Sequence, residues 1–488
     1  MTEEAKPANG KAEEELKKDR KLLGIEPIET SHQITVRGKT LNYTARAGSM
    51  PLTDDCDNVE AEVFFTSYEL DGVEDHGSRP LTIAFNGGPG SASIWLHMGA
   101  LGPKRVVMEP EGWMPAPPYR YEDNVHAWLD QTDLLFIDPV GTGYSRASKP
   151  DHDKKFWSYQ GDIESVGEVI RLFLTRYARW TSPLFLAGES YGTTRAAALA
   201  GHLVDRGIAF NGIVLISTVL DFQSIRFLPA NDLPFQLFVP TYAATAWYHQ
   251  RLESSLQEKS VQALIDEVKA WAEGPLTSAL MKGDRLDEVE QAQIAGQLAA
   301  YTGIDPTYIS GSNLRLNIFN FCKELLRSEK RSVGRLDSRF KGVEAATVNA
   351  QPEFDPSLHA ITPPYSAAFN HYARTELGVE TDLNYETLSF KVNGSWQWDN
   401  GRIPATGEIL REAMAKNPHM RVFVGQGIYD LATPLFATEY MISHMNIDAA
   451  LRAQVETENY EAGHMFYLDV DSLAAFREDI RRFIDSAA

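Results

Sequence analysis

The stretch LFLAGESYGTTRAAALA, residues 184–200, decides the fold. It begins with an apolar run typical of a strand covered on both faces, and it ends in alanines that favour a helix. Between them lies Gly188-Glu189-Ser190-Tyr191-Gly192, the pattern G-x-S-x-G. Its two glycines permit a sharp turn that presents the Ser190 hydroxyl above the sheet, with the helix N-terminus behind it. A plain turn with a structural serine is the alternative that this pattern leaves open by itself.

The rest of the chain repeats this rhythm of strand and helix. Short apolar runs, typical of buried strands, lie at residues 81–85, 134–137, 213–216 and 421–424. Helical patterns lie between several of them, notably at 163–180 and 193–204, and a hairpin of 34–37 with 41–45 and a strand at 61–70 come first. The pattern predicts an α/β protein with a mostly parallel, doubly wound sheet.

One interval interrupts the alternation of strand and helix. About 200 residues separate the strand at 213–216 from the one at 421–424, far more than a normal crossover connection. Amphipathic helical patterns at 261–272 and 286–300 lie within it. We therefore expect a mainly helical cap. The predicted organisation is a charged tail at 1–31, a first core segment at 32–219, the cap insertion at 220–390 and a second core segment at 391–488.

Composition excludes several classes of protein. The 488 residues are 43% hydrophobic, so a large core can form, and the net charge of −21 disfavours nucleic acid and anionic lipid as partners. No run approaches the roughly 20 apolar residues that span a bilayer. The interleaved charges of the tail contain no signal-peptide core, so we expect a cytoplasmic protein, or a periplasmic or secreted one if a signal was removed earlier. Two cysteines cannot build a disulfide framework.

A serine nucleophile needs a base, and the base needs an acid that fixes its tautomer. When the serine sits on a turn of this kind, the acid and then the histidine follow late strands. Asp430 comes directly after the strand at 421–424, and His464 follows a strand-like run at 455–460. His444 is the other histidine after Asp430, but it falls in a helical stretch where a packed or surface role is expected. Without Ser190, Asp430 would be interpreted as a turn residue and His464 as a loop histidine.

Acyl chemistry also needs N–H donors for a developing oxyanion. The loop Asn86-Gly87-Gly88-Pro89-Gly90 leaves the strand at 81–85 where such a loop is expected, and the backbone N–H groups of Gly88 and Tyr191 are the candidate donors. A tight turn is the alternative for the glycines alone. The sequence contains no dinucleotide fingerprint, no phosphate-binding loop motif and no H-E-x-x-H. No metal or cofactor is therefore expected.

Together these motifs, with Asp138-Pro139-Val140-Gly141-Thr142-Gly143-Tyr144-Ser145 and Gly463-His464-Met465, resemble the serine carboxypeptidase family of α/β-hydrolases. The resemblance covers residue 32 to the end. It implies release of C-terminal residues from peptides with a free carboxyl terminus, best at acidic pH. It also implies a triad of Ser190, Asp430 and His464, and it places Asn86 and Glu189 at positions that bind the terminal carboxylate. A desolvated Glu189 can stay protonated and donate a hydrogen bond to that carboxylate; a structural partner for nearby backbone is the alternative role.

Three positions depart from the family pattern. Ala84 replaces a tryptophan, Ala100 replaces a second glutamate, and Ser91 replaces a cysteine. These changes predict a bacterial-type member with an incomplete carboxylate site. An esterase or acyltransferase that uses the same triad is the alternative function, and a non-catalytic binding protein is a third. The preferred C-terminal residue and the oligomeric state stay open.

Overall fold

A computed structural model describes residues 17–398 and 404–488; residues 1–16 of the predicted tail lie outside the described residues.

The first strands of the chain form the predicted antiparallel hairpin. Strand β1 (Ile28–Val36) pairs with β2 (Lys39–Thr53), and β2 pairs with β3 (Val59–Leu70). Strand β1 begins inside the segment predicted as tail. Its first half is polar and half exposed, so no apolar run marks it.

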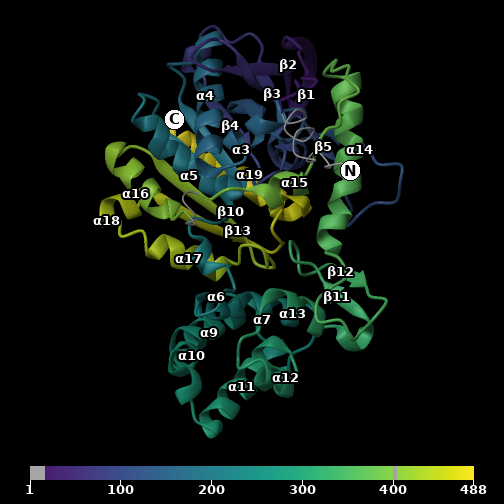
Figure 1. Cartoon of the computed structure of the whole chain (residues 1–488), viewed down its shortest axis with the longest axis vertical. Helices are drawn as coiled ribbons and strands as arrows, with labels where there is room; N and C mark the ends of the chain where they lie inside the picture. The colour runs from purple at the N-terminus through teal and green to yellow at the C-terminus, as the bar shows by residue number, and fades with distance from the viewer. Residues whose placement is uncertain (1–16, 399–403) are drawn as a thin grey trace, which may run out of the picture.

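Ten of the described strands build one large mixed sheet (Figure 1). The order is β1-β2-β3-β7-β4-β9-β10-β13-β14, with short β8 on β3. From β7 onward, neighbouring strands in this order run parallel, as predicted. The remaining strands of this sheet are β4 (Leu81–Phe85), β7 (Asp133–Ile137), β8 (Arg146–Ala147), β9 (Leu184–Ser190), β10 (Gly212–Thr218), β13 (Arg421–Gly427) and β14 (Val455–Tyr460). Strands β5 (Lys104–Val106) and β6 (Tyr121–Asp123) pair in a separate two-stranded sheet.

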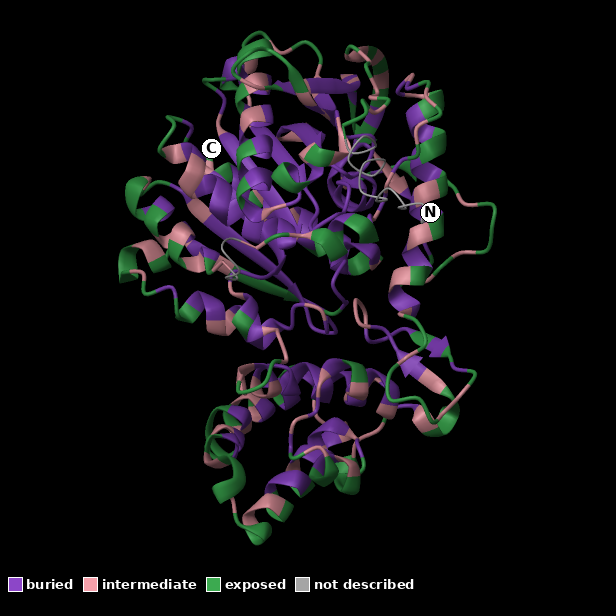
Figure 2. Ribbon diagram, in the orientation of Figure 1, coloured by how far each residue is buried: buried purple, intermediate pink, exposed green. Residues whose placement is uncertain are grey.

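Helices cover both faces of this sheet. One face packs against α4, α5, α16 and α17, and the other packs against α2, α14 and α19. Figure 2 shows the buried residues concentrated in the sheet and on the inner sides of these helices. The bounds of the helices around the sheet are α2 (Ile94–Leu96), α3 (Asp153–Phe156), α4 (Tyr159–Arg176), α5 (Tyr191–Val204), α14 (Pro356–Thr375), α15 (Phe390–Ser395), α16 (Thr406–Lys416), α17 (Leu435–Ser443), α18 (Ala449–Arg452) and α19 (Val470–Ala487).

Helices α6 to α13 form a separate layer below the sheet in Figure 1, and their hydrophobic core also takes in the loop after β13 and the start of α17. Its elements are α6 (Leu233–Leu237), α7 (Val239–Tyr248), α8 (Ser254–Gln257), α9 (Val261–Trp271), α10 (Thr277–Lys282), α11 (Glu288–Thr302), α12 (Pro306–Gly311), α13 (Ile318–Glu324), β11 (Arg331–Val333) and β12 (Lys341–Val343). We propose 220–390 as the limits of the insertion in sequence, although α14, inside those limits, packs on the sheet. No helix among the described residues is long and apolar enough to cross a bilayer.

A buried ion pair fixes the helix that follows the serine. Arg195 of α5 donates to both oxygens of Asp162 on α4, at 2.8 and 3.1 Å, and also to the backbone oxygen of Asn86, at 2.6 Å. Both side chains of the pair are almost completely buried. Two helices and the loop after β4 are thereby held together through one guanidinium.

Replacing Arg195 with Met should leave the buried Asp162 carboxylate without its ion-pair partner. Breaking such a pair from one side costs about 3–5 kcal/mol of unfolding free energy. Urea unfolding followed by circular dichroism measures the loss. As a control, Arg171→Met removes an exposed arginine that pairs with Glu168 on the same helix, and it should cost at most about 1 kcal/mol. Equal stability of Arg195→Met and the wild type would contradict this account.

Candidate active site

The turn that carries Ser190 has a strained backbone. Ser190 ends β9 and caps α5 with φ 60° and ψ −129°, a conformation that residues with a Cβ rarely adopt. Both glycines of the motif are required by close packing. A Cβ at Gly188 would lie 2.2 Å from the oxygen of Gly192, and a Cβ at Gly192 would lie 2.8 Å from the oxygen of Phe85. The turn therefore exposes the serine side chain at the end of β9, as the motif predicts.

His464 and Asp430 form a hydrogen-bonded pair below Ser190. The Nδ1 of His464 lies 2.7 Å from Oδ2 of Asp430, whose side chain is completely buried. The other Asp430 oxygen accepts the backbone N–H groups of Ala432 and Thr433, at 2.7 and 3.0 Å. An N–H donated from Nδ1 to Asp430 leaves Nε2 as the proton acceptor of the ring. Burial opposes protonation of His464, but the charge and hydrogen bond of Asp430 outweigh it, so the pKa of His464 is raised.

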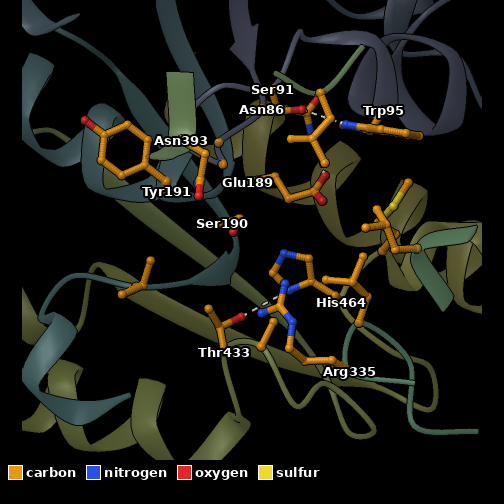
Figure 3. Close-up of a pocket in the computed structure, with 18 of the residues that line it drawn as sticks. Asn86, Ser91, Trp95, Glu189, Ser190, Tyr191, Arg335, Asn393, Thr433 and His464 are labelled. Atoms are coloured by element: carbon orange, nitrogen blue, oxygen red, sulfur yellow. Dashed lines mark hydrogen bonds between the residues drawn. The ribbon is translucent and has the colours of Figure 1, made fainter. Parts of the chain in front are cut away.

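Ser190 and His464 line the same cavity, and Figure 3 shows the imidazole beside the serine. No hydrogen bond joins their side chains in the described part of the chain. Such contacts are often long without substrate and tighten when it binds. Parallel strands bring the three residues together, because β9, β13 and β14 all end at the same edge of the sheet.

The glycine loop after β4 lies against the serine turn. A Cβ at Gly87 would lie 2.4 Å from the backbone nitrogen of Tyr191, so the two segments are in contact. Gly88 has a φ of 105°, which favours glycine. Within the described chain, no protein acceptor takes the N–H of Gly88 or Tyr191. Both predicted donors are therefore available beside Ser190.

Glu189 and Asn86, which the resemblance places at the substrate carboxylate, are in contact with each other. The amide Nδ2 of Asn86 donates to Oε2 of Glu189 at 2.9 Å, and the hydroxyl of Tyr467 donates to the same oxygen at 2.5 Å. The backbone N–H of Leu96 binds Oδ1 of Asn86 and thus fixes the orientation of its amide. Burial raises the pKa of Glu189 to about 7, although His464 and the two hydrogen bonds oppose that shift.

Sequence reasoning missed two residues of this site. Thr433 donates its hydroxyl to Asp430 at 2.7 Å and lies 3.3 Å from Nδ1 of His464. Tyr467 supports Glu189. Their positions in the sequence could have indicated a role in the site, since Thr433 lies three positions after Asp430 and Tyr467 three positions after His464. His444, which the sequence analysis did not choose as the base, is exposed and stacks on Tyr440, as expected of a surface role.

The cavity around Ser190 has a volume of about 350 Å³, and we describe its lining as two walls because the apolar residues named below pack in two different clusters. The first wall is carried by the loop after β4, by α2, by α14 and by the segment after His464, and its lining includes Asn86, Trp95, Leu358, Ile361 and Met465. The second wall follows β10 and includes Val219, Phe222, Ile225 and Arg226. Trp396 and Trp398 are partly buried and pack against Tyr191 behind the second wall, so they serve as packing residues there.

The groups that surround Ser190 are protein side chains and backbone N–H groups. Within residues 17–398 and 404–488, no group of three or more His, Cys, Asp or Glu side chains could hold a metal ion. The arrangement offers a hydroxyl, an oriented imidazole and free N–H donors, the set required for acyl transfer through a covalent intermediate.

Comparisons with known proteins find serine carboxypeptidases. Residues 39–467 match the sequence profile described as serine carboxypeptidase. Serine carboxypeptidase-like 36 of Arabidopsis thaliana is 30% identical over 414 residues, which cover 80% of this chain and 69% of that protein. Pheromone-processing carboxypeptidase KEX1 of Saccharomyces cerevisiae strain JAY291 is 33% identical over 156 residues, 30% of this chain but only 20% of that protein.

A solved structure supports the fold over most of the chain. The crystal structure of KEX1(delta)p, a prohormone-processing carboxypeptidase from Saccharomyces cerevisiae, matches with a TM-score of 0.57 and 16% identity. The match covers 91% of each chain. The predicted α/β-hydrolase fold is thereby confirmed.

The raised pKa of Glu189 should make stability depend on pH. The unfolded chain releases this proton near pH 4.5 and the folded chain near pH 7, so the unfolding free energy falls between these values, by about 3 kcal/mol in all. Below pH 4.5 Glu189 is protonated in both the folded and the unfolded chain, so the unfolding free energy keeps the full contribution of this group. Glu189→Gln cannot titrate and should lack this fall, which urea unfolding between pH 4.5 and 7.5 measures. The same pH dependence in both proteins would contradict the assigned pKa.

Proposed function

The chain belongs to the serine carboxypeptidase family, and on that premise we propose that it releases C-terminal residues from peptides through an acyl-enzyme. The observation that carries the proposal is the hydrogen bond between His464 and Asp430 beside Ser190. The hydrogen-bonded pair of Asn86 and Glu189 lines the same cavity. A nucleophile with its base is thus next to groups suited to a carboxylate. Peptides with a free carboxyl terminus are the proposed substrates.

In the proposed reaction, Ser190 attacks the carbonyl carbon of the last peptide bond. His464 accepts the serine proton at Nε2 and gives it to the leaving amine. Asp430 holds the ring in the productive tautomer and stabilises the imidazolium that forms. Water then attacks the acyl-enzyme with His464 again as base, and the shortened peptide leaves.

The backbone N–H groups of Gly88 and Tyr191 are the proposed oxyanion donors. Each carries a fixed dipole that needs no rearrangement during the reaction, and losing one such donor typically costs about 100- to 1,000-fold in kcat. The Tyr191 donor is at the start of α5, where the helix dipole adds positive potential.

Asn86 and Glu189 are the proposed binding groups for the terminal carboxylate. Below about pH 7 Glu189 keeps its proton and can donate a hydrogen bond to an anionic ligand. Above that pH the ionised side chain would repel it. The proposed site thus combines a neutral acid with the Asn86 amide.

An esterase or acyltransferase that uses the same triad is a second candidate, favoured by one observation. Ala84 and Ala100 are fully buried and supply no polar side chain where the family pattern has a tryptophan and a second glutamate. Recognition of the terminal carboxylate therefore depends on fewer groups. A non-catalytic binding protein is a weaker candidate, because all three triad positions are filled.

A peptide and its C-terminally amidated twin separate the two enzymatic candidates. A carboxypeptidase should cleave the free acid about tenfold or more faster in kcat/KM at pH 6, because only the acid completes the hydrogen bonds to Asn86 and Glu189. Mass spectrometry of the products measures both rates. Equal rates on the two peptides, or cleavage of simple esters with no peptide cleaved, would contradict the carboxypeptidase assignment.

The KM for a free-acid peptide should rise with pH. With a pKa of about 7, Glu189 is mostly protonated at pH 6 and mostly ionised at pH 8, so KM should increase about tenfold between them. Glu189→Gln keeps a donor and should change KM less than about twofold over the same range. Initial rates at several substrate concentrations give the values. A steep rise retained in Glu189→Gln would assign the titration to another group.

A further inference from the structure

Arg226 brings a positive charge to the second wall of the cavity that holds Ser190. It follows a short 3-10 turn, Phe222–Ser224, in the connection after β10. Its guanidinium lies over the rings of Phe222 and Trp398, with its carbon 5.3 and 5.0 Å from their centroids. Two aromatic contacts thus hold a half-buried cation at the cavity surface.

The guanidinium of Arg226 has no anionic partner in the part of the chain that the structure describes. Among the described residues, no carboxylate or carbonyl accepts a hydrogen bond from it, and no ion pair includes it. Burial without such a partner lowers the pKa of Arg226, although an arginine stays charged at any physiological pH. Arg335, the other arginine of the cavity, differs, because its Nε lies 4.0 Å from Asp355. A half-buried charge normally pairs with an opposite charge, so an external anion fits here.

The position of Arg226 indicates which part of a substrate would meet it. Asn86 and Glu189 are the proposed binding groups for the terminal carboxylate, and Asn86 belongs to the first wall. The released residue is therefore expected on that side of Ser190. We infer that the residue before the cleaved bond then faces the second wall, which Val219, Phe222 and Arg226 line. That residue's side chain is the group that can reach the guanidinium.

We propose that Arg226 selects peptides with an acidic side chain on the residue before the cleaved bond, an inference that rests on the proposed carboxypeptidase function. A carboxylate can pair with the planar guanidinium by two parallel hydrogen bonds. Among the described residues that line the cavity, Glu189 is the single acidic one, against Arg226 and Arg335, so none of them offers an anion to a lysine or arginine side chain on the second wall. The net charge of −21 repels an anionic peptide that approaches the protein, but salt screens this repulsion at distances beyond about 10 Å.

Three N-acylated dipeptides, Glu-Phe, Gln-Phe and Lys-Phe, test the inference through release of Phe at pH 6 and 0.15 M salt. For the wild type we expect kcat/KM about tenfold higher on the Glu peptide than on the Gln peptide, and lowest on the Lys peptide. Arg226→Met should bring the Glu to Gln ratio near one, chiefly by raising KM for the Glu peptide. Arg226→Glu should reverse the order of Glu and Lys.

Two controls keep the outcomes separate. Arg171→Met removes an exposed arginine of α4 and should leave the Glu to Gln ratio unchanged. Arg335→Met should also keep most of the preference; if it alone abolishes the preference, the assignment to Arg226 is wrong. Equal rates of the wild type on the Glu and Gln peptides would overturn this inference alone. No release of Phe from any of the three peptides would contradict the proposed function itself.

Discussion

The rest of the site depends on the strained backbone of Ser190. Its positive φ turns the chain from β9 directly into α5, and this turn sets both the serine side chain and the Tyr191 N–H at one point. Gly188 and Gly192 make the turn possible because neither position has room for a Cβ. The cost of such a conformation, of order 1–3 kcal/mol, is offset by the packing around it. The Asp162–Arg195 pair is the main polar part of that packing.

Burial then sets the charges of the site. Glu189 and His464 are both buried and line the same cavity, yet their partners differ. Asp430 favours the charged form of His464, whereas Glu189 meets hydrogen-bond donors that do not outweigh its desolvation. One group is therefore suited to accept a proton and the other to keep one, and such different environments for two neighbouring titratable groups are typical of acid–base sites. Because the two side chains interact, measured pKa values belong to the pair as a whole.

The sequence predicted the parts of this structure that depend on local pattern. Buried strands and the G-x-S-x-G turn have strong local signals, and the chain order then pointed to Asp430 and His464. Tyr467 was missed because its contact with Glu189 depends on how a turn after β14 packs against β9, across 278 residues. The early start of β1 was missed because an edge strand needs no apolar residues. The packing of α14 on the sheet, rather than in the cap, likewise follows from tertiary contacts that periodicity does not encode.

Covalent labelling tests the central claim, that Ser190 is a nucleophile activated by His464, most directly. A fluorophosphonate should add once to the folded protein, and peptide mass spectrometry should find the adduct on Ser190. Labelling should be absent in Ser190→Ala and at least about a thousandfold slower in His464→Ala, since the serine hydroxyl is a weak nucleophile without its base. An adduct on another residue, or labelling of His464→Ala at the rate of the wild type, would contradict the account.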